Sequence, residues 1–100
     1  MQHWQYPDLL PSPSVVLQMM QDCSLRQTRN RVVVLQVMLG MSQQEFSCQS
    51  LYQVLLRYQT PVPMSTLNAS LHEFENVGLA QSRVICGERF YRIKPRYCGG

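Results

Sequence analysis

The chain has 100 residues, of which 45% are hydrophobic and 15% are charged, and it carries a formal net charge of +3. A chain of this length builds one domain with a single core, which excludes a second lobe around a deep active-site cavity. It shows no signal peptide and no apolar run near the length of a membrane span, so we expect a cytoplasmic protein with free thiols and no membrane partner.

The excess positive charge lies in two segments of the chain. Residues 26–31 contain three arginines and no acidic residue, and residues 79–100 contain five basic residues against the single acid Glu88. The remaining segments are slightly acidic. Two basic segments that meet in the fold would form a surface for phosphate groups, which is the electrostatic pattern expected for a nucleic-acid partner.

Residues 1–13 form no periodic element, because three prolines prevent a continuous helix. Trp4, Tyr6, Leu9 and Leu10 make this segment unusually apolar for a disordered tail. We therefore expect an arm that packs either on the domain or on a partner, and a homodimer held by this arm is one form of the second alternative.

Four helices are predicted along the chain, and each begins beside residues typical of helix starts. In the second helix, the run Val32–Val34 could equally form a strand by propensity, but the apolar side that continues to Leu39 favours a helix. The starting residues are Ser12 with Pro13, Thr28, Ser47 preceded by Phe46, and Ser65. The predicted helices span residues 13–23, 29–39, 48–58 and 65–77.

The fourth of these helices has one apolar stripe and one free polar face. Leu67, Leu71 and Phe74 recur at steps of four and three, so they lie along one side of the helix. Gly78 follows where a helix often ends in a left-handed residue, a conformation that costs glycine little. The free face is predicted to present Thr66, Asn68, Ala69, His72 and Glu73.

Two strand-like runs, Leu79–Ile85 and Phe90–Ile93, follow that glycine and are joined by a short link that contains Gly87. A helix, a glycine stop and a basic hairpin indicate a recognition helix followed by a wing. The predicted fold is α+β, mainly α: a winged helix-turn-helix with four helices followed by a two-stranded antiparallel wing. The predicted parts are an arm over residues 1–13, a winged-helix domain over 14–94 and a tail over 95–100.

This fold suggests contacts to double-stranded DNA. Ser65 and Thr66 can donate to a phosphate at the positive end of the helix dipole, and Asn68 can pair with an adenine edge. Arginines at the entry of the second helix and on the hairpin would add salt-sensitive phosphate contacts. The expected DNA-binding residues are Arg26, Thr28, Arg29, Arg31, Ser65, Thr66, Asn68, His72, Arg83, Arg89 and Arg92.

No group of residues in the sequence predicts catalysis. The only two histidines, His3 and His72, cannot build a catalytic constellation alone, and no glycine-rich phosphate loop is present. The four cysteines are too widely spaced for a zinc site. We expect no enzyme, no cofactor, no metal and no small-molecule substrate, with a redox thiol protein as the weakest alternative.

Four segments of the chain together resemble the DNA-binding half of the ferric-uptake-regulator (Fur) family. They are Ser24–Leu39 (SLRQTRNRVVVLQVML), Phe46–Leu55 (FSCQSLYQVL), Val62–Leu79 and Gly87–Tyr91 (GERFY). The resemblance implies a transcriptional regulator of the repressor type. It places Arg26 at a minor-groove contact, Arg31 at a backbone contact, and Ser65 with Thr66 at the start of the major-groove helix.

Two departures from the family limit what the resemblance implies. Asn68 and Ala69 follow Leu67, where the family typically has tyrosine and arginine, so recognition of the family's usual operator is not expected. The family's metal-binding dimerisation half has no counterpart in the sequence, so metal sensing by its mechanism is not expected either. The predicted helix also carries Glu73 and Glu75 but no lysine or arginine, which leaves open a protein-interaction winged helix, such as an antirepressor, a decoy or a complex subunit.

Overall fold

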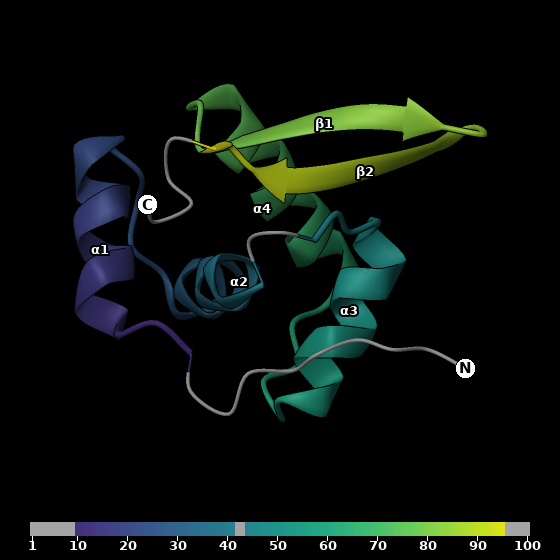
Figure 1. The fold of residues 1–100 in the computed structure, drawn as a ribbon. Helices are drawn as coiled ribbons and strands as arrows, with labels where there is room; N and C mark the ends of the chain where they lie inside the picture. The colour runs from purple at the N-terminus through teal and green to yellow at the C-terminus, as the bar shows by residue number, and fades with distance from the viewer. Residues whose placement is uncertain (1–9, 42–43, 96–100) are drawn as a thin grey trace.

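The computed structural model of the protein describes residues 10–41 and 44–95. Its elements are the helices α1 (Pro13–Asp22), α2 (Arg29–Gly40), α3 (Cys48–Arg57) and α4 (Met64–Asn76) and the strands β1 (Ala80–Ile85) and β2 (Glu88–Ile93). In Figure 1, α2 is seen end-on at the centre, with α1 and α3 on either side and the hairpin above. The four helices and the antiparallel hairpin confirm the predicted winged-helix fold.

Three of the four predicted helix caps are formed. The side-chain oxygens of Ser12, Thr28 and Ser47 each accept a hydrogen bond from a backbone N–H in the first turn of the helix that follows. The prediction that Ser65 caps the fourth helix is wrong, because α4 begins one residue earlier, after Pro63. The proline ring fixes φ at −55° at the cap position, and no side-chain cap is present there among the described residues.

The run Val32–Val34 lies in α2, so the strand alternative is not formed. The helix is in contact with α1, α3, α4 and β2, and this packing outweighs the β propensity of its valines. Val34, Leu35, Val37 and Met38 are all buried on it. Gly40 is the last helical residue, one position later than predicted.

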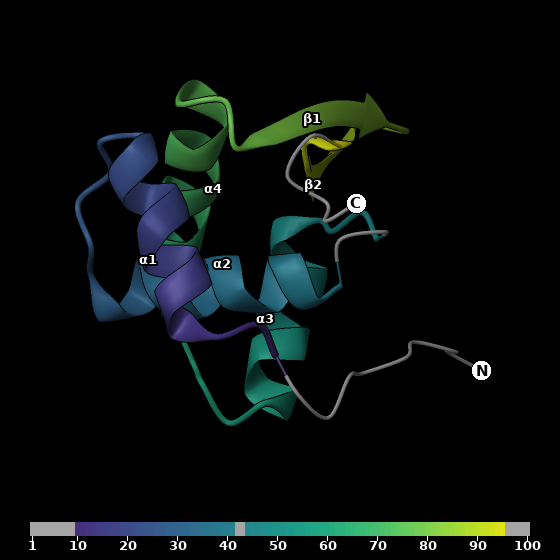
Figure 2. The same ribbon diagram turned by 60° about the vertical axis from the view of Figure 1, so that its left-hand side comes forward.

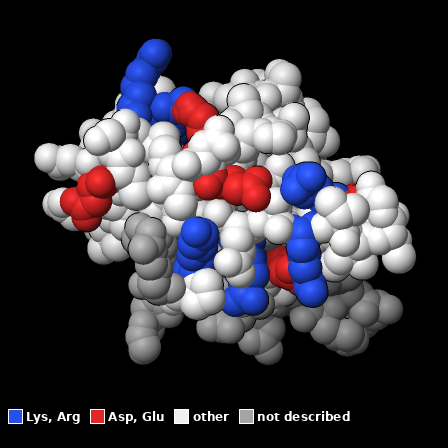
Figure 3. Space-filling view, turned by 90° about the horizontal axis from the view of Figure 1, so that it is seen from above, with Lys and Arg blue, Asp and Glu red and all other residues white. Residues whose placement is uncertain are grey.

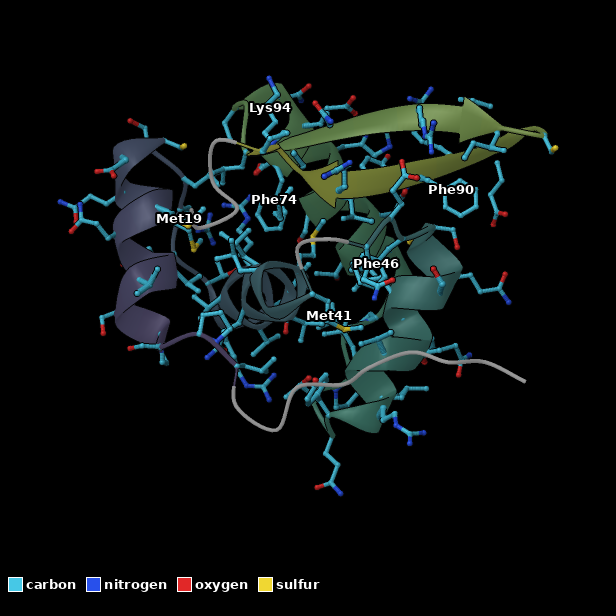
Figure 4. The ribbon with its side chains drawn as sticks, viewed as in Figure 1. Met19, Met41, Phe46, Phe74, Phe90 and Lys94 are labelled. Atoms are coloured by element: carbon cyan, nitrogen blue, oxygen red, sulfur yellow. The ribbon has the colours of Figure 1, made fainter. Side chains whose placement is uncertain are left out.

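The core lies around α2, between the other helices and the underside of the hairpin. Phe46 and Phe74 are its largest fully buried side chains, and both lie beneath the hairpin (Figure 4). Figure 2 shows α4 descending from the start of β1 beside α2. Burial of Leu67, Leu71 and Phe74 confirms the predicted apolar stripe and fixes which side of α4 faces outward.

The turn of the wing is shorter than predicted, because β2 begins at Glu88 instead of Phe90. Cys86 and Gly87 form the turn with φ of +52° and +81°, the pair of positive angles that matches the twist of a tight hairpin. Gly78 also has a positive φ, +84°, as predicted for the end of α4. A bridge from Phe46 to Tyr91 ties the other edge of β2 to the residues just before α3.

The predicted N-terminal arm is described only from Leu10 onward, and most of it lies outside the described residues. Leu10 packs against the core, and the side chain of Gln36 on α2 donates a 2.8 Å hydrogen bond to the carbonyl of Pro11. The predicted tail lies outside the description beyond residue 95. None of the helices in the described part of the chain is long and apolar enough to cross a membrane.

Candidate nucleic-acid interface

The outward face of α4 is polar and open. Ser65, Asn68 and His72 are exposed on it, and Thr66 is half-buried, so four of the expected DNA-binding residues share one face. Because Pro63 precedes the helix without a side-chain cap, the first backbone N–H groups of α4 remain available to an acceptor. This face can therefore accept a phosphate at its start and present side chains farther along.

A hollow of about 520 Å³ lies on one flank of α4, against the start of α2. We call it the α2-side hollow. Its lining includes Arg26, Thr28, Arg31, Ser65, Thr66 and Glu73. The fold thus brings Arg26 and Arg31 to the first turn of α4, over a separation of more than thirty residues in the sequence.

A second hollow, of about 720 Å³, lies on the opposite flank between α4, the start of α3 and the wing. We call it the wing-side hollow. Its lining includes Ser47, Cys48, Ser65, Asn68, His72, Arg89 and Tyr91. Ser65 lines both hollows, so the exposed start of α4 is a ridge between two depressions that each carry an arginine.

The acid nearest to the α2-side hollow is paired. Arg31 Nη2 donates to both carboxylate oxygens of Glu73, at 2.6 Å to Oε2, and Arg31 Nη1 donates to the carbonyl of Arg26 at 2.9 Å. The Arg31 side chain is 21% exposed and that of Glu73 is 38% exposed. The charge of Glu73 is therefore largely compensated on the face where an anion would approach.

The second acid of α4 is engaged beneath the wing. The Ser82 hydroxyl donates to Glu75 Oε2 at 2.6 Å, and Arg89 Nη1 donates to the same hydroxyl at 2.8 Å. Ser82 thus joins the wing to α4 and fixes one nitrogen of Arg89. Arg89 is exposed and also lines the wing-side hollow.

Arg83 and Arg92 lie on the outer face of the hairpin, away from both hollows. Register pairs Gln81 with Arg92 and Arg83 with Phe90, so these side chains alternate with the inward-facing ones. Arg83 donates two hydrogen bonds to Glu45, at 2.6 and 2.8 Å, and these lower the pKa of that carboxyl below its ordinary value of 4.5. Seen from above the hairpin, the basic side chains form separate groups with acids among them (Figure 3).

Arg29 lies exposed at the first position of α2 and lines neither hollow. Thr28 lines the α2-side hollow, although its hydroxyl is occupied in part by the N–H of Arg31. The structure therefore groups Arg26, Thr28, Arg31, Ser65 and Thr66 on one flank of α4. It groups Asn68, His72 and Arg89 on the other flank.

The sequence analysis did not predict that Ser47, Cys48 and Tyr91 line the wing-side hollow. Cys48 Sγ lies 3.6 Å from Met64 Sδ, and burial raises the pKa of the Cys48 thiol. The rings of His72 and Tyr91 meet edge-on with centroids 6.2 Å apart. No local pattern in the sequence signals the contact between Cys48 and Met64, because these residues are 16 positions apart. Within the described residues, no three His, Cys, Asp or Glu side chains lie close enough to hold a metal ion.

Comparison with solved structures identifies the architecture. Fur from Pseudomonas aeruginosa has a TM-score of 0.75 at 24% identity and covers 79% of this chain and 60% of its own. Fur from Vibrio cholerae has a TM-score of 0.73 at 21% identity, and the match covers 79% of this chain and 61% of the Fur chain. PerR from Streptococcus pyogenes has a TM-score of 0.65 at 19% identity, and the match covers 93% of this chain and 62% of the PerR chain. The fold is a winged helix.

The winged-helix chain spans about three-fifths of the length of each of these regulators. No protein-family model matches the sequence, and no curated protein matches it. The matches to the two Fur structures agree with the Fur resemblance noted from the sequence, because they show the same winged-helix fold.

Proposed function

We propose that this chain is the DNA-binding module of a transcriptional regulator and that α4 enters the major groove of duplex DNA. The observation that carries the proposal is the polar face of α4, which stands between two hollows that each contain an arginine. A helix of this size fits the major groove, where base edges carry a distinct donor and acceptor pattern.

Phosphate contacts are assigned to residues around the start of α4. Ser65 and Thr66 sit beside free backbone N–H groups at the positive end of the helix dipole, which favours an anion. Arg26 flanks them from the α2-side hollow and Arg89 from the wing-side hollow. These contacts fix the register of α4 on the duplex and supply affinity that falls as salt rises.

Sequence reading is assigned to Asn68, with His72 one turn farther along the same face. An asparagine amide can donate to and accept from an adenine at once, and such a paired contact gives about 1–3 kcal/mol of discrimination. One small module buries limited surface on DNA, so tight discrimination would need two copies. A homodimer is therefore part of the proposal.

The main objection to DNA binding is that α4 carries two acids and no lysine or arginine, and the partners of those acids weaken this objection. Glu73 is compensated by Arg31, and Glu75 accepts from Ser82 beneath the wing. Glu73 therefore has a counter-charge within the protein, and Glu75 is engaged by a hydroxyl of the wing. Similar folds also support the proposal, because the V. cholerae protein has DNA-binding domains and the S. pyogenes protein acts in gene regulation.

The proposal is tested by selection of sites from a random duplex library with the wild-type protein, Asn68→Ala and Gln53→Ala. Gln53 is exposed on α3 and lines neither hollow, which makes it the matched control. We expect one enriched motif that Gln53→Ala retains and that loses its adenine preference at one position in Asn68→Ala. Failure of the wild-type protein to enrich any motif would contradict sequence-specific binding.

A protein-interaction module is the second candidate, and the tip of the wing favours it. Val84 and Ile85 are 55% and 39% exposed there, next to the exposed acid Glu88. Exposed apolar side chains beside an acid fit a protein surface better than a phosphate backbone. Flow-through on heparin together with no shift of duplex DNA at low ionic strength would favour this candidate.

A further inference from the structure

Arg31 joins three segments that are separate in the sequence. It belongs to the first turn of α2, it donates through Nη1 to the carbonyl of Arg26 in the α1–α2 connection, and it donates through Nη2 to Glu73 on α4. The two acceptors lie on different elements, so one planar guanidinium is shared between them. Both terminal nitrogens of the guanidinium therefore donate within the protein.

The connection that Arg31 holds is conformationally constrained. Ser24, two residues after the end of α1, adopts a positive φ of +56°, which is uncommon for a residue with a side chain. The N–H of Leu25 donates to the carbonyl of Met20 at 2.8 Å, so the chain turns sharply before it reaches Arg26. The hydrogen bond from Arg31 to the Arg26 carbonyl fixes the backbone of Arg26 after this turn. It thereby fixes the position of the Arg26 side chain, which lines the α2-side hollow.

We infer that Arg31 is a positioning residue rather than a phosphate contact, and that the pair Arg31–Glu73 locks α4 and Arg26 in one fixed arrangement. This inference rests on the proposed function, because the arrangement matters for the phosphates and bases that α4 meets. In this role Glu73 is the residue of α4 that Arg31 binds, and its negative charge ties α4 to the start of α2.

The alternative role for Arg31 makes different predictions. A phosphate-binding Arg31 would have to release Glu73, leaving a half-buried carboxylate without its partner beside the incoming phosphate. In that case Glu73 would weaken DNA binding, and its removal would strengthen it. In a positioning role, removal of either partner disorders the same arrangement and weakens binding.

The test compares the salt dependence of duplex binding for wild-type protein, Arg31→Ala, Arg31→Lys, Glu73→Gln and the double variant Arg31→Ala/Glu73→Gln. Arg89→Ala is the control for a lost phosphate contact, because Arg89 is exposed and lines the wing-side hollow. We expect Arg31→Ala and Glu73→Gln each to weaken binding by about 2- to 30-fold, with the double variant no weaker than the weaker single variant. The slope of log affinity against log salt should stay unchanged in these variants and fall by about one in Arg89→Ala.

Arg31→Lys keeps the charge but cannot serve both acceptors, so a positioning role predicts that it fails to restore affinity. The inference is overturned if Glu73→Gln strengthens binding, if Arg31→Ala lowers the salt slope by about one, or if Arg31→Lys restores wild-type affinity. The same variants are measured in urea unfolding without DNA, where the lock predicts non-additive losses. Non-additive unfolding with no duplex binding by any protein would overturn the proposed function alone, whereas additive unfolding would overturn the lock.

Discussion

Arg83 and Arg89 lie on opposite faces of the same hairpin, although both were expected to contact DNA. Arg89 pairs with Val84 across the strands and lines the wing-side hollow, whereas Arg83 pairs with Phe90 and is bound to Glu45. Alternation along a strand therefore separates arginines that the sequence groups together. If α4 enters the major groove, Arg89 is the wing arginine that faces the duplex beside it.

Substitution of these two arginines should have unequal effects on DNA binding. Arg89→Ala should weaken duplex binding and lower the slope of log affinity against log salt by about one, because one phosphate contact is lost. Arg83→Ala should leave the slope unchanged. Fluorescence anisotropy across a salt series measures both, and equal slopes for the two variants would contradict the assignment of Arg89.

Phe46→Ala should destabilise the domain strongly. Phe46 is fully buried, and its backbone exchanges hydrogen bonds of 2.8 and 2.7 Å with Tyr91, so it links the core to the wing. Truncation of a buried phenylalanine costs about 3–5 kcal/mol in free energy of unfolding. The matched control is Phe90→Ala, which removes a half-buried ring of the wing and should cost less in the same urea titration. An equal cost for both variants would argue against this core.

Stability should fall at alkaline pH through Tyr91. Burial, with a smaller contribution from Glu75, raises the pKa of the Tyr91 phenol above its ordinary value of 10.0. The folded state thus disfavours the phenolate, and stability that is fully present below pH 10 is lost as the pH rises beyond it. Unfolding titrations at about pH 8 and about pH 10.5 should show a larger loss for wild type than for Tyr91→Phe. Equal losses would show that Tyr91 does not carry the effect.

The cysteines should differ in their rate of alkylation. Cys86 is exposed at the turn of the wing, whereas Cys48 is half-buried against Met64 and burial raises its thiol pKa. Less thiolate and less access both slow the reaction of Cys48 with iodoacetamide near neutral pH. Peptide mass spectrometry over a time course should detect the Cys86 adduct before the Cys48 adduct. Earlier modification of Cys48 would mean that the wing-side hollow is more open than the structure indicates.

The elements that the sequence predicted well are those set by neighbouring residues. Ser12, Thr28 and Ser47 cap helices because a side-chain oxygen meets an N–H only two or three residues away. Ser65 failed as a cap because Pro63 already provides the required backbone angles, and a cap prediction based on side chains overlooks this. The turn at Cys86 and Gly87 was predicted too long, since the non-glycine residue takes a positive φ that propensity does not suggest.

Eight of the residues expected to bind DNA line the two hollows beside α4, but Arg29, Arg83 and Arg92 line neither hollow. The face of α4 followed from helical spacing, and the grouping of Arg26 with Ser65 followed from the fold. The partners of the acids did not, because Arg31 and Glu73 are 42 positions apart and no local pattern links them. Glu73 read as an obstacle to phosphates in the sequence, whereas in the structure it is the partner of an arginine.

The most direct test of the account is an NMR titration of the labelled protein with the selected duplex, read as changes in backbone amide shifts. We expect the largest changes at Ser65, Thr66, Asn68 and His72 on α4 and at Arg89 on the wing, with small changes at exposed positions of α1 such as Gln18. Changes concentrated on α1 or on the outer face of the wing around Arg83, with α4 unaffected, would contradict it.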